Sequence, residues 1–324
     1  MSFAPRISVV IPTKRLTAES RARIERLRLQ TYPNFDVYVV TDEPESFPAD
    51  GLDVRFLASG PVFPNQKRLQ AARASDAAIV ALIDDDAYAI PEWLARAAPH
   101  FADPGVIAAG GPGVTPPEDG PEQQISGAIF ASPLVSAAQA RRYVPLRACE
   151  VDLQPTCNLL IRREDFIVAA ERTLSIWPGE DAMLCMELRR GGKRIVYDPA
   201  VLVYHHRRAL FGGHFRQVWN YAVARGHFIK AFPEMSRDPA YLVPLLFAAG
   251  NVALAVAPAA PAPVRRAAGV AAAGYLALVA WEAARAQRTN AVDPLKTALG
   301  IYLTHLTYGA GVAYGLAGLL RRPA

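Results

Sequence analysis

The sequence predicts an α/β domain with a Rossmann-like, mostly parallel sheet, followed by C-terminal membrane-associated helices. Three observations lead to this fold class. Short β-branched runs alternate with helical segments over residues 1–209. From Tyr241 onward, apolar and small residues dominate and acidic residues almost vanish. The chain of 324 residues is 52% hydrophobic and 20% charged, which supports a large buried core and excludes a disordered protein.

The strands and helices of the front domain can be placed in order. Residues 7–11 form a β-branched run closed by Pro12, as expected for a buried strand that ends in a loop. Strands followed by helices at regular intervals are typical of a parallel sheet with right-handed crossovers, and such sheets bind ligands beyond the carboxyl ends of their strands. We expect further strands at 35–40, 54–57 and 78–83, and helices at 17–30, 65–74 and 91–101.

Three acidic residues follow the apolar strand at 78–83. Asp84, Asp85 and Asp86 lie in one loop at the expected edge of the sheet. Adjacent carboxylates repel one another unless a cation or hydrogen-bond donors lie among them. Mn²⁺ and Mg²⁺ typically bind one or two carboxylates together with the oxygens of a substrate diphosphate. A metal site is therefore one interpretation, and a solvated acidic turn or helix N-cap is the other.

Six collinear segments of the front domain form a set: VVIPT at 9–13, YPNFDVYVVTDEP at 32–44, NQKRLQAA at 65–72, ALIDDDAYAIPEWL at 81–94, PTCNLLIRRED at 155–165, and WPGEDAMLCMELRRGGKRIVYDP at 177–199. Together they resemble the family 2 glycosyltransferases, which have the GT-A nucleotide-sugar fold. The resemblance implies an inverting, metal-dependent enzyme with Mn²⁺ or Mg²⁺ as cofactor and a nucleotide-diphosphate sugar as donor, a UDP-sugar being the first expectation.

The resemblance also implies roles for residues on the donor side. Thr13 and Asp42 match positions that hold the base, and Asp86 matches a direct metal ligand. Leu69 stands where many relatives have asparagine, and Glu43-Pro44 where many have aspartate and glycine, so the match is incomplete here. For the basic pair Lys67 and Arg68, a solvated helix face is the alternative. The expected nucleotide-sugar contacts are Pro12, Thr13, Asp42, Lys67, Arg68, Asp84, Asp85 and Asp86.

A second acidic pair stands at the start of a predicted helix. Glu180 and Asp181 follow the turn of residues 177–179, where acidic side chains can simply stabilise the helix dipole. The resemblance implies a catalytic pair with Asp181 as the base, which accepts a proton from the acceptor hydroxyl. It also implies that Asn158 and Trp177 lie on the acceptor side, although Asn158 can equally be a turn amide.

Two histidines follow the strand-like stretch YDPAVLVY. His205 and His206, with Asp84 and Asp86, are the candidate metal ligands, because a neutral imidazole can complete the coordination of a divalent ion. Arg207 and Arg208 come next and can bind a diphosphate or a lipid phosphate. The alternative for the whole run is a basic surface near anionic lipid.

The C-terminal part is expected to associate with a membrane. The segment at 210–234 combines aromatic and basic residues at helical spacing, as in an interface helix, with a soluble packing helix as the alternative. Three apolar segments at 241–257, 267–284 and 299–320 have the length of a membrane span, with alanine-rich soluble core helices as the alternative. Arginines flank them on both sides, so their orientation stays open. The expected domains are 1–209, 210–234 and 235–324.

Composition also excludes several classes of protein. Three cysteines without a CxxC pair argue against a disulfide scaffold or a thiolate zinc site. The N-terminus has no recognisable signal peptide. Nucleic acid is not an expected partner despite the net charge of +5, because aromatic and basic residues gather beside the apolar tail.

We therefore expect transfer of a single sugar to a lipid-linked or membrane-proximal glycan acceptor, by a catalytic domain on the cytoplasmic face of the cell inner membrane. One alternative is a processive polysaccharide synthase subunit. Such enzymes carry a QxxRW motif, which residues 217–219 match only superficially because the arginine is missing. The other is a catalytically silent membrane anchor that binds nucleotide sugar.

Overall fold

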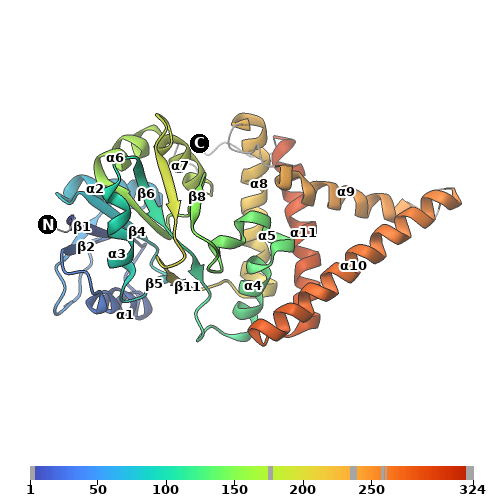
Figure 1. The fold of residues 1–324 in the computed structure, drawn as a ribbon, viewed down its shortest axis with the longest axis horizontal. Helices are drawn as coiled ribbons and strands as arrows, with labels where there is room; N and C mark the ends of the chain where they lie inside the picture. Colours follow the sequence, from blue (N-terminus) through green and yellow to red (C-terminus); the bar gives the residue numbers. More distant parts are fainter. Residues whose placement is uncertain (1–3, 174–177, 234–238, 257–258, 260, 319–324) are drawn as a thin grey trace. The chain divides into compact units, whose positions relative to one another are not determined.

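The computed structural model describes residues 4–173, 178–233, 239–256, 259 and 261–318 (Figure 1). The chain forms two compact units, which are considered separately. The first comprises residues 1–116 and 141–206, and the second comprises residues 117–140 and 207–324. The expected boundary after residue 209 lies close to the division at 206. The second unit also takes in residues 117–140, which the sequence pattern assigned to the front domain.

The first unit is built on an eight-stranded sheet with the order β3-β2-β1-β4-β9-β6-β10-β8. Strands β1, β2, β3 and β4 run parallel, as do β6 and β10, while β9 is antiparallel to both β4 and β6. The prediction of a mostly parallel sheet is therefore confirmed. The strands are β1 Ile7–Pro12, β2 Phe35–Thr41, β3 Val54–Ala58, β4 Ile79–Ile83, β6 Val106–Gly110, β8 Cys149–Val151, β9 Asn158–Arg162 and β10 Arg194–Tyr197.

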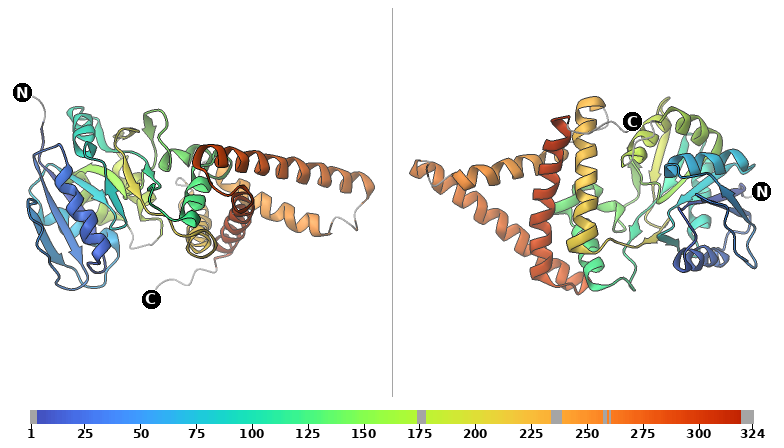
Figure 2. Two further views of the ribbon diagram at one scale, coloured as in Figure 1. Left: turned by 90° about the horizontal axis from the view of Figure 1, so that it is seen from below. Right: turned by 180° about the vertical axis from the view of Figure 1, so that it is seen from behind.

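Both faces of this sheet are covered by helices (Figures 1 and 2). One face packs its apolar side chains against α1, η1, α3 and η2, and the other against α2, α6 and α7. A strand buried on both faces needs a continuous apolar run, which explains why β1 does not alternate. The helices are α1 Ala18–Glu25, η1 Arg26–Leu29, α2 Pro64–Ala74, α3 Trp93–Ala97, η2 Ala98–Ala102, α6 Arg163–Arg172 and α7 Glu180–Leu188.

A second, three-stranded sheet connects the acidic loop to a distant part of the chain. It consists of β5 Ala87–Ala89, β11 Val203–His205 and β7 Gly113–Val114, in the order β5-β11-β7. The antiparallel pairing of β5 with β11 places His205 opposite Ala87, next to the acidic residues. The sequence pattern did not reveal this sheet, because strands of two or three residues are too short to show a period.

The second unit is helical. Its helices are α4 Pro121–Ala131, α5 Pro133–Ser136, a π-helical turn at Leu210–His214, α8 Phe215–Ala231, η6 Pro239–Leu242, α9 Val243–Val256, α10 Ala262–Asn290 and α11 Pro294–Leu316. Helices α8 and α11 pack closely because glycines face the opposing backbone. A Cβ at Gly226 would lie 2.3 Å from the carbonyl oxygen of Val312, and one at Gly315 would lie 2.2 Å from that of Val223. One face of α8 is therefore a packing face.

The three expected membrane segments all fall on helices, but they differ in character. Among the described residues, α10 is the one helix long and apolar enough to cross a membrane, judged by length and composition. Only 17% of its most apolar 18-residue stretch is buried within the protein. Helix α9 is apolar but shorter, and α11 buries one side against α8 and α9. Of the three segments expected to span a membrane, the one on α10 therefore remains a candidate span by length and composition among the described residues.

Candidate active site

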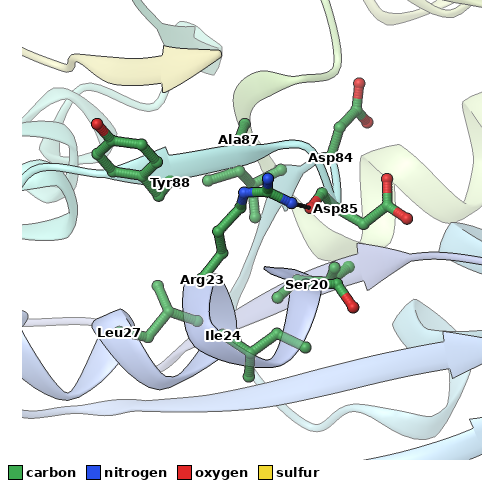
Figure 3. Close-up of a pocket in the computed structure, with 10 residues that line it drawn as sticks. Ser20, Arg23, Ile24, Leu27, Asp84, Asp85, Ala87 and Tyr88 are labelled. Carbon is green, nitrogen blue, oxygen red and sulfur yellow. Dashed lines mark hydrogen bonds between the residues drawn. The ribbon is translucent and has the colours of Figure 1, made fainter. Parts of the chain in front are cut away.

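The acidic loop begins directly after β4, beside the end of β1. The Thr13 hydroxyl donates a hydrogen bond to Asp85 Oδ2 at 2.5 Å. Arg23 of α1 donates to the backbone oxygen of Asp85 at 3.0 Å, and lines a pocket with Leu27 and Tyr88 (Figure 3). Burial raises the pKa of Asp85, the Thr13 bond opposes this, and the neighbouring aspartates add to it. Two elements therefore hold the loop, and sequence reasoning did not identify Arg23.

Three side chains form a candidate metal site: Asp84, Asp86 and His205. One ligand atom from each lies within 4.8 Å of the other two, and His205 Nε2 is 3.0 Å from Asp86 Oδ1. Burial by itself would lower the pKa of His205, but Asp86 and Cys157 together raise it well above the ordinary value. Two carboxylate oxygens and one imidazole nitrogen fit a divalent ion such as Mn²⁺ and leave room for phosphate oxygens.

His206 is placed differently from His205. Its ring lies 5.9 Å from the ring of Tyr88, between centroids, and its backbone N–H donates to the Asp86 carbonyl at 3.0 Å. The cluster found among the described residues includes His205 and not His206. His206 follows the last residue of β11, so the strand register that places His205 opposite Ala87 does not extend to it.

Lys67 connects the two residues expected to hold the base. Its Nζ donates to Asp42 Oδ1 and to the backbone oxygen of Thr13. The Lys67 side chain is only 3% exposed, so it forms a buried connection between the loops that follow β1 and β2. Pro12 ends β1 within the same ladder, where it pairs with Val40 of β2. These contacts bring Pro12, Thr13, Asp42 and Lys67 together, with Lys67 facing the carboxylate of Asp42.

Arg68 lies between the acidic loop and the acidic pair of α7. Its guanidinium is 3% exposed and donates from Nη2 to Asp84 Oδ1 at 2.6 Å. Its charge also acts on Asp181 and Glu180. The Nε and Nη1 groups of Arg68 are buried and have no hydrogen-bond partner within the part of the chain that is described. Spare buried donors of this kind suit an additional anionic group at the site.

Glu180 and Asp181 begin helix α7, after a turn that requires glycine. Gly179 has a φ of +125°, and its N–H donates to Glu180 Oε2 at 3.0 Å. The Thr156 hydroxyl donates to Asp181 Oδ1 at 2.6 Å. Burial and then repulsion from Asp181 raise the pKa of Glu180 to about 7, against the attraction of Arg68. Burial also raises the pKa of Asp181, opposed by Arg68 and Thr156.

The acidic pair therefore has the character of a proton acceptor that works near neutral pH. Arg68 and Thr156 favour the ionised form of Asp181, and Arg68 also favours that of Glu180. Sequence reasoning did not identify Thr156, which lies two residues before Asn158 in the segment PTCN. Trp177, the other residue expected on the acceptor side, lies outside the described residues.

We expect Glu180→Gln to stabilise the protein at pH 8 but not at pH 4. The folded-state pKa of Glu180 is raised from 4.5 to about 7, so the folded state holds this proton more tightly than the unfolded state. The free energy of unfolding is undiminished at pH values below the pKa of Glu180 in the unfolded state, and it falls as the pH rises through about 7. Glutamine avoids this cost, which is about 3 kcal/mol. Urea unfolding at both pH values measures it, and an equal gain at pH 4 would contradict the assignment.

Asn158 is buried inside the frame of the site. Its Oδ1 accepts a hydrogen bond from Trp93 Nε1 at 2.8 Å, and its Nδ2 donates to the carbonyls of Pro112 and Val201 at 3.1 and 2.7 Å. The residue has no exposed surface, so it cannot line an acceptor surface in this structure. It instead joins β9 to α3 and to the segments that precede β7 and β11.

Replacing Asn158 with alanine should destabilise the fold by about 2–4 kcal/mol, because it leaves one buried donor and two buried acceptors unpaired. Trp93→Phe removes the donor of just one of these bonds and should cost less. Equilibrium unfolding of the two variants gives the comparison. A cost below about 1 kcal/mol for Asn158→Ala would mean that water or a shifted side chain replaces the amide.

The fold is of the GT-A type that glycosyltransferases have. Residues 8–167, just under half of the chain, match the family described as Glycosyl transferase family 2.

Two similar proteins show how far the likeness extends. The solved mannosyltransferase PcManGT from Pyrobaculum calidifontis, in complex with GDP-Man and Mn²⁺, is 20% identical, with a TM-score of 0.65 over 97% of this chain and 88% of that one. At this identity the likeness concerns the fold. The uncharacterized protein y4gI of Sinorhizobium fredii is 29% identical over 240 residues, covering 65% of this chain. The match spans only 26% of that relative.

Proposed function

We propose that the protein is an inverting, metal-dependent glycosyltransferase that moves a single sugar from a nucleotide-diphosphate sugar to a lipid-linked or membrane-proximal glycan acceptor. The observation that carries this proposal is the link from the Asp84, Asp86 and His205 cluster through Arg68 to Glu180 and Asp181. A site for a leaving diphosphate and a base for an incoming hydroxyl are thereby joined in one unit.

Asp181 is the proposed base. Its carboxylate takes the proton of the acceptor hydroxyl as that oxygen bonds to the anomeric carbon from the side opposite the diphosphate. The bond between the anomeric carbon and the diphosphate oxygen breaks, and its electron pair stays on the diphosphate. Direct displacement of this kind inverts the anomeric centre and needs a single carboxylate. A divalent ion held by Asp84, Asp86 and His205 would neutralise the charge that develops on the diphosphate.

The donor is proposed to be a UDP-sugar, with a GDP-sugar as the first comparison because PcManGT was solved in complex with GDP-Man and Mn²⁺. Thr13 and Asp42, joined through Lys67, offer hydroxyl and carboxylate groups for the base. These groups fit the hydrogen-bonding edge of a nucleobase but do not by themselves select one.

The acceptor and the location are proposed from the second unit. Apolar side chains of α10 are exposed along its length, including Val270 at 74% and Trp281 at 60%. Such a surface is costly in water and is expected to lie in lipid. We therefore place the enzyme at the cell inner membrane with its catalytic unit on the cytoplasmic face, where a lipid-linked acceptor would be within reach.

Purified full-length protein incubated with UDP- and GDP-sugars, Mn²⁺ and detergent-dispersed lipid-linked glycans tests the proposal. We expect release of one nucleoside diphosphate for each sugar added, one sugar per acceptor, and inversion at the anomeric carbon measured by NMR. Long products would indicate a processive synthase. Nucleotide-sugar binding without transfer to any acceptor would indicate a silent anchor, and either result would overturn the proposal.

A further inference from the structure

The backbone of the acidic loop, residues 84–86, is held at each of its three carbonyl groups. The carbonyls of the first and last aspartate accept hydrogen bonds from the backbone N–H groups of Ala87 and His206, at 3.1 and 3.0 Å. The carbonyl of Asp85, between them, accepts from Arg23 Nη1 at 3.0 Å, and this bond is drawn in Figure 3. Backbone groups therefore fix two of the three carbonyls, whereas the middle one depends on a side chain of α1.

Packing directs the Arg23 side chain toward the loop. Arg23 is half-buried and lines the pocket of Figure 3 beside Leu27 of η1 and Tyr88 of β5. Both neighbours are themselves buried. Arginine can lay its apolar stem along such a surface while its charged end reaches a polar partner. The guanidinium is therefore placed by packing between η1 and β5.

A second arginine of the same helical segment contacts the next element of the chain. Arg26 comes three residues after Arg23, and residues at this spacing are neighbours on a helix surface. Its guanidinium carbon lies 3.9 Å from the centroid of the Tyr88 ring, and that ring stacks on Tyr204 with 5.0 Å between centroids. Tyr88 of β5 and Tyr204 of β11 are also partners in the strand register. The helical segment therefore contacts both the acidic loop and the pair of strands that ends in His205.

The candidate metal ligands come from the two elements that these arginines contact. Asp84 and Asp86 belong to the acidic loop, and His205 ends β11. Their ligand atoms already lie within 4.8 Å of one another, and the distances to a bound ion must be met to within about 0.2 Å. A loop that shifted against β11 would lose this spacing.

We propose that Arg23 is a positioning residue of the metal site: its hydrogen bond to the Asp85 carbonyl fixes the acidic loop against α1 and thereby sets the spacing of the three metal ligands. Asp85 is not a member of the ligand cluster found among the described residues. It is instead the point at which the loop is attached, through its carboxylate to Thr13 and through its carbonyl to Arg23. The inference rests on the metal site of the proposed function.

The test measures the binding of Mn²⁺ alone to the full-length protein, by the loss of the EPR signal of the free ion. Removal of a residue that orients metal ligands typically weakens binding about 10- to 100-fold. We expect a change of that size in Arg23→Met, which keeps the apolar stem but has no donor. In Arg23→Lys an ammonium group can still donate to the carbonyl, so binding should recover to within a few-fold of the parent. Arg28→Ala is the matched control and should bind like the parent, because Arg28 is exposed and pairs with Glu25 of α1.

Two outcomes separate the role of Arg23 from the metal site itself. If Arg23→Met binds Mn²⁺ as tightly as the parent while Asp86→Ala does not bind, the role of Arg23 is overturned and the metal site stands. If Asp86→Ala also binds like the parent, the metal site of the proposed function is wrong. Binding by Arg23→Lys as weak as that by Arg23→Met would contradict the hydrogen-bond role. Should Arg23→Met fail to fold, Arg23→Leu also lacks a donor and favours a helix, and it is expected to bind as weakly.

Discussion

Asp181→Asn should lower kcat by about 10²–10⁴, the usual contribution of a positioned general base. The amide keeps the shape of the side chain and can still interact with the Thr156 hydroxyl, which lies 2.6 Å from Asp181 Oδ1, but it cannot take a proton. Binding of the nucleotide sugar should change little, because Thr13, Asp42 and Lys67 are untouched. Initial rates with saturating donor, together with donor affinity from calorimetry, measure the two effects separately.

A control in the same unit is Asp152→Asn. The Asp152 side chain is 83% exposed and pairs with Arg189, so its replacement should leave kcat within about two-fold, since exposed ion pairs contribute little. Glu180→Gln tests which carboxylate is the base. If Glu180→Gln lowers kcat by about 10²–10⁴ while Asp181→Asn turns over at the parental rate, the two roles must be exchanged.

Asp86→Ala should abolish Mn²⁺ binding and lower turnover by about 10³ or more. Charge neutralisation by a bound metal contributes several kcal/mol to stabilising a departing phosphate group. Asp86 is the member of the cluster in direct contact with His205, at 3.0 Å, so its loss removes one ligand and frees another. Steady-state rates at increasing Mn²⁺ concentrations, with EDTA-treated protein as reference, provide the measurement.

Asp50→Ala is the matched control for this variant, because Asp50 is exposed and lies outside the cluster. It should respond to EDTA and Mn²⁺ as the parent does. Turnover by Asp86→Ala that rises with Mn²⁺ at parental concentrations would contradict the proposed metal site. Turnover by the EDTA-treated parent at the full rate would remove the metal from the proposed reaction.

The sequence predicted the features that depend on neighbouring residues. The β-branched run at 7–11 is a strand because both faces of β1 are buried, and the run at 78–83 delivers Asp84, Asp85 and Asp86 to the loop that follows β4. Glu180 and Asp181 begin a helix, as the turn before them indicated. In each case, the local pattern and the position along the chain determine where the side chain goes.

Contacts between segments far apart in the chain were harder to predict from the sequence. Asn158 looked like an acceptor-side or turn amide, yet its hydrogen bonds reach Trp93, Pro112 and Val201 and bury it completely. No local pattern distinguishes the two, because the difference lies in which strands flank β9. The antiparallel insertion of β9 between β4 and β6 is likewise a matter of sheet order.

The sequence by itself determined the strands and helices of the catalytic unit, the two acidic groups, and the apolar character of the C-terminal helices. These follow from hydrophobic period and from residues adjacent in the chain. Only the tertiary structure decided that His205 and not His206 joins Asp84 and Asp86, that Arg68 lies between the acidic groups, and that α11 is partly a packing helix. Strand register and close helix packing set these contacts, and both arise between segments far apart in the chain.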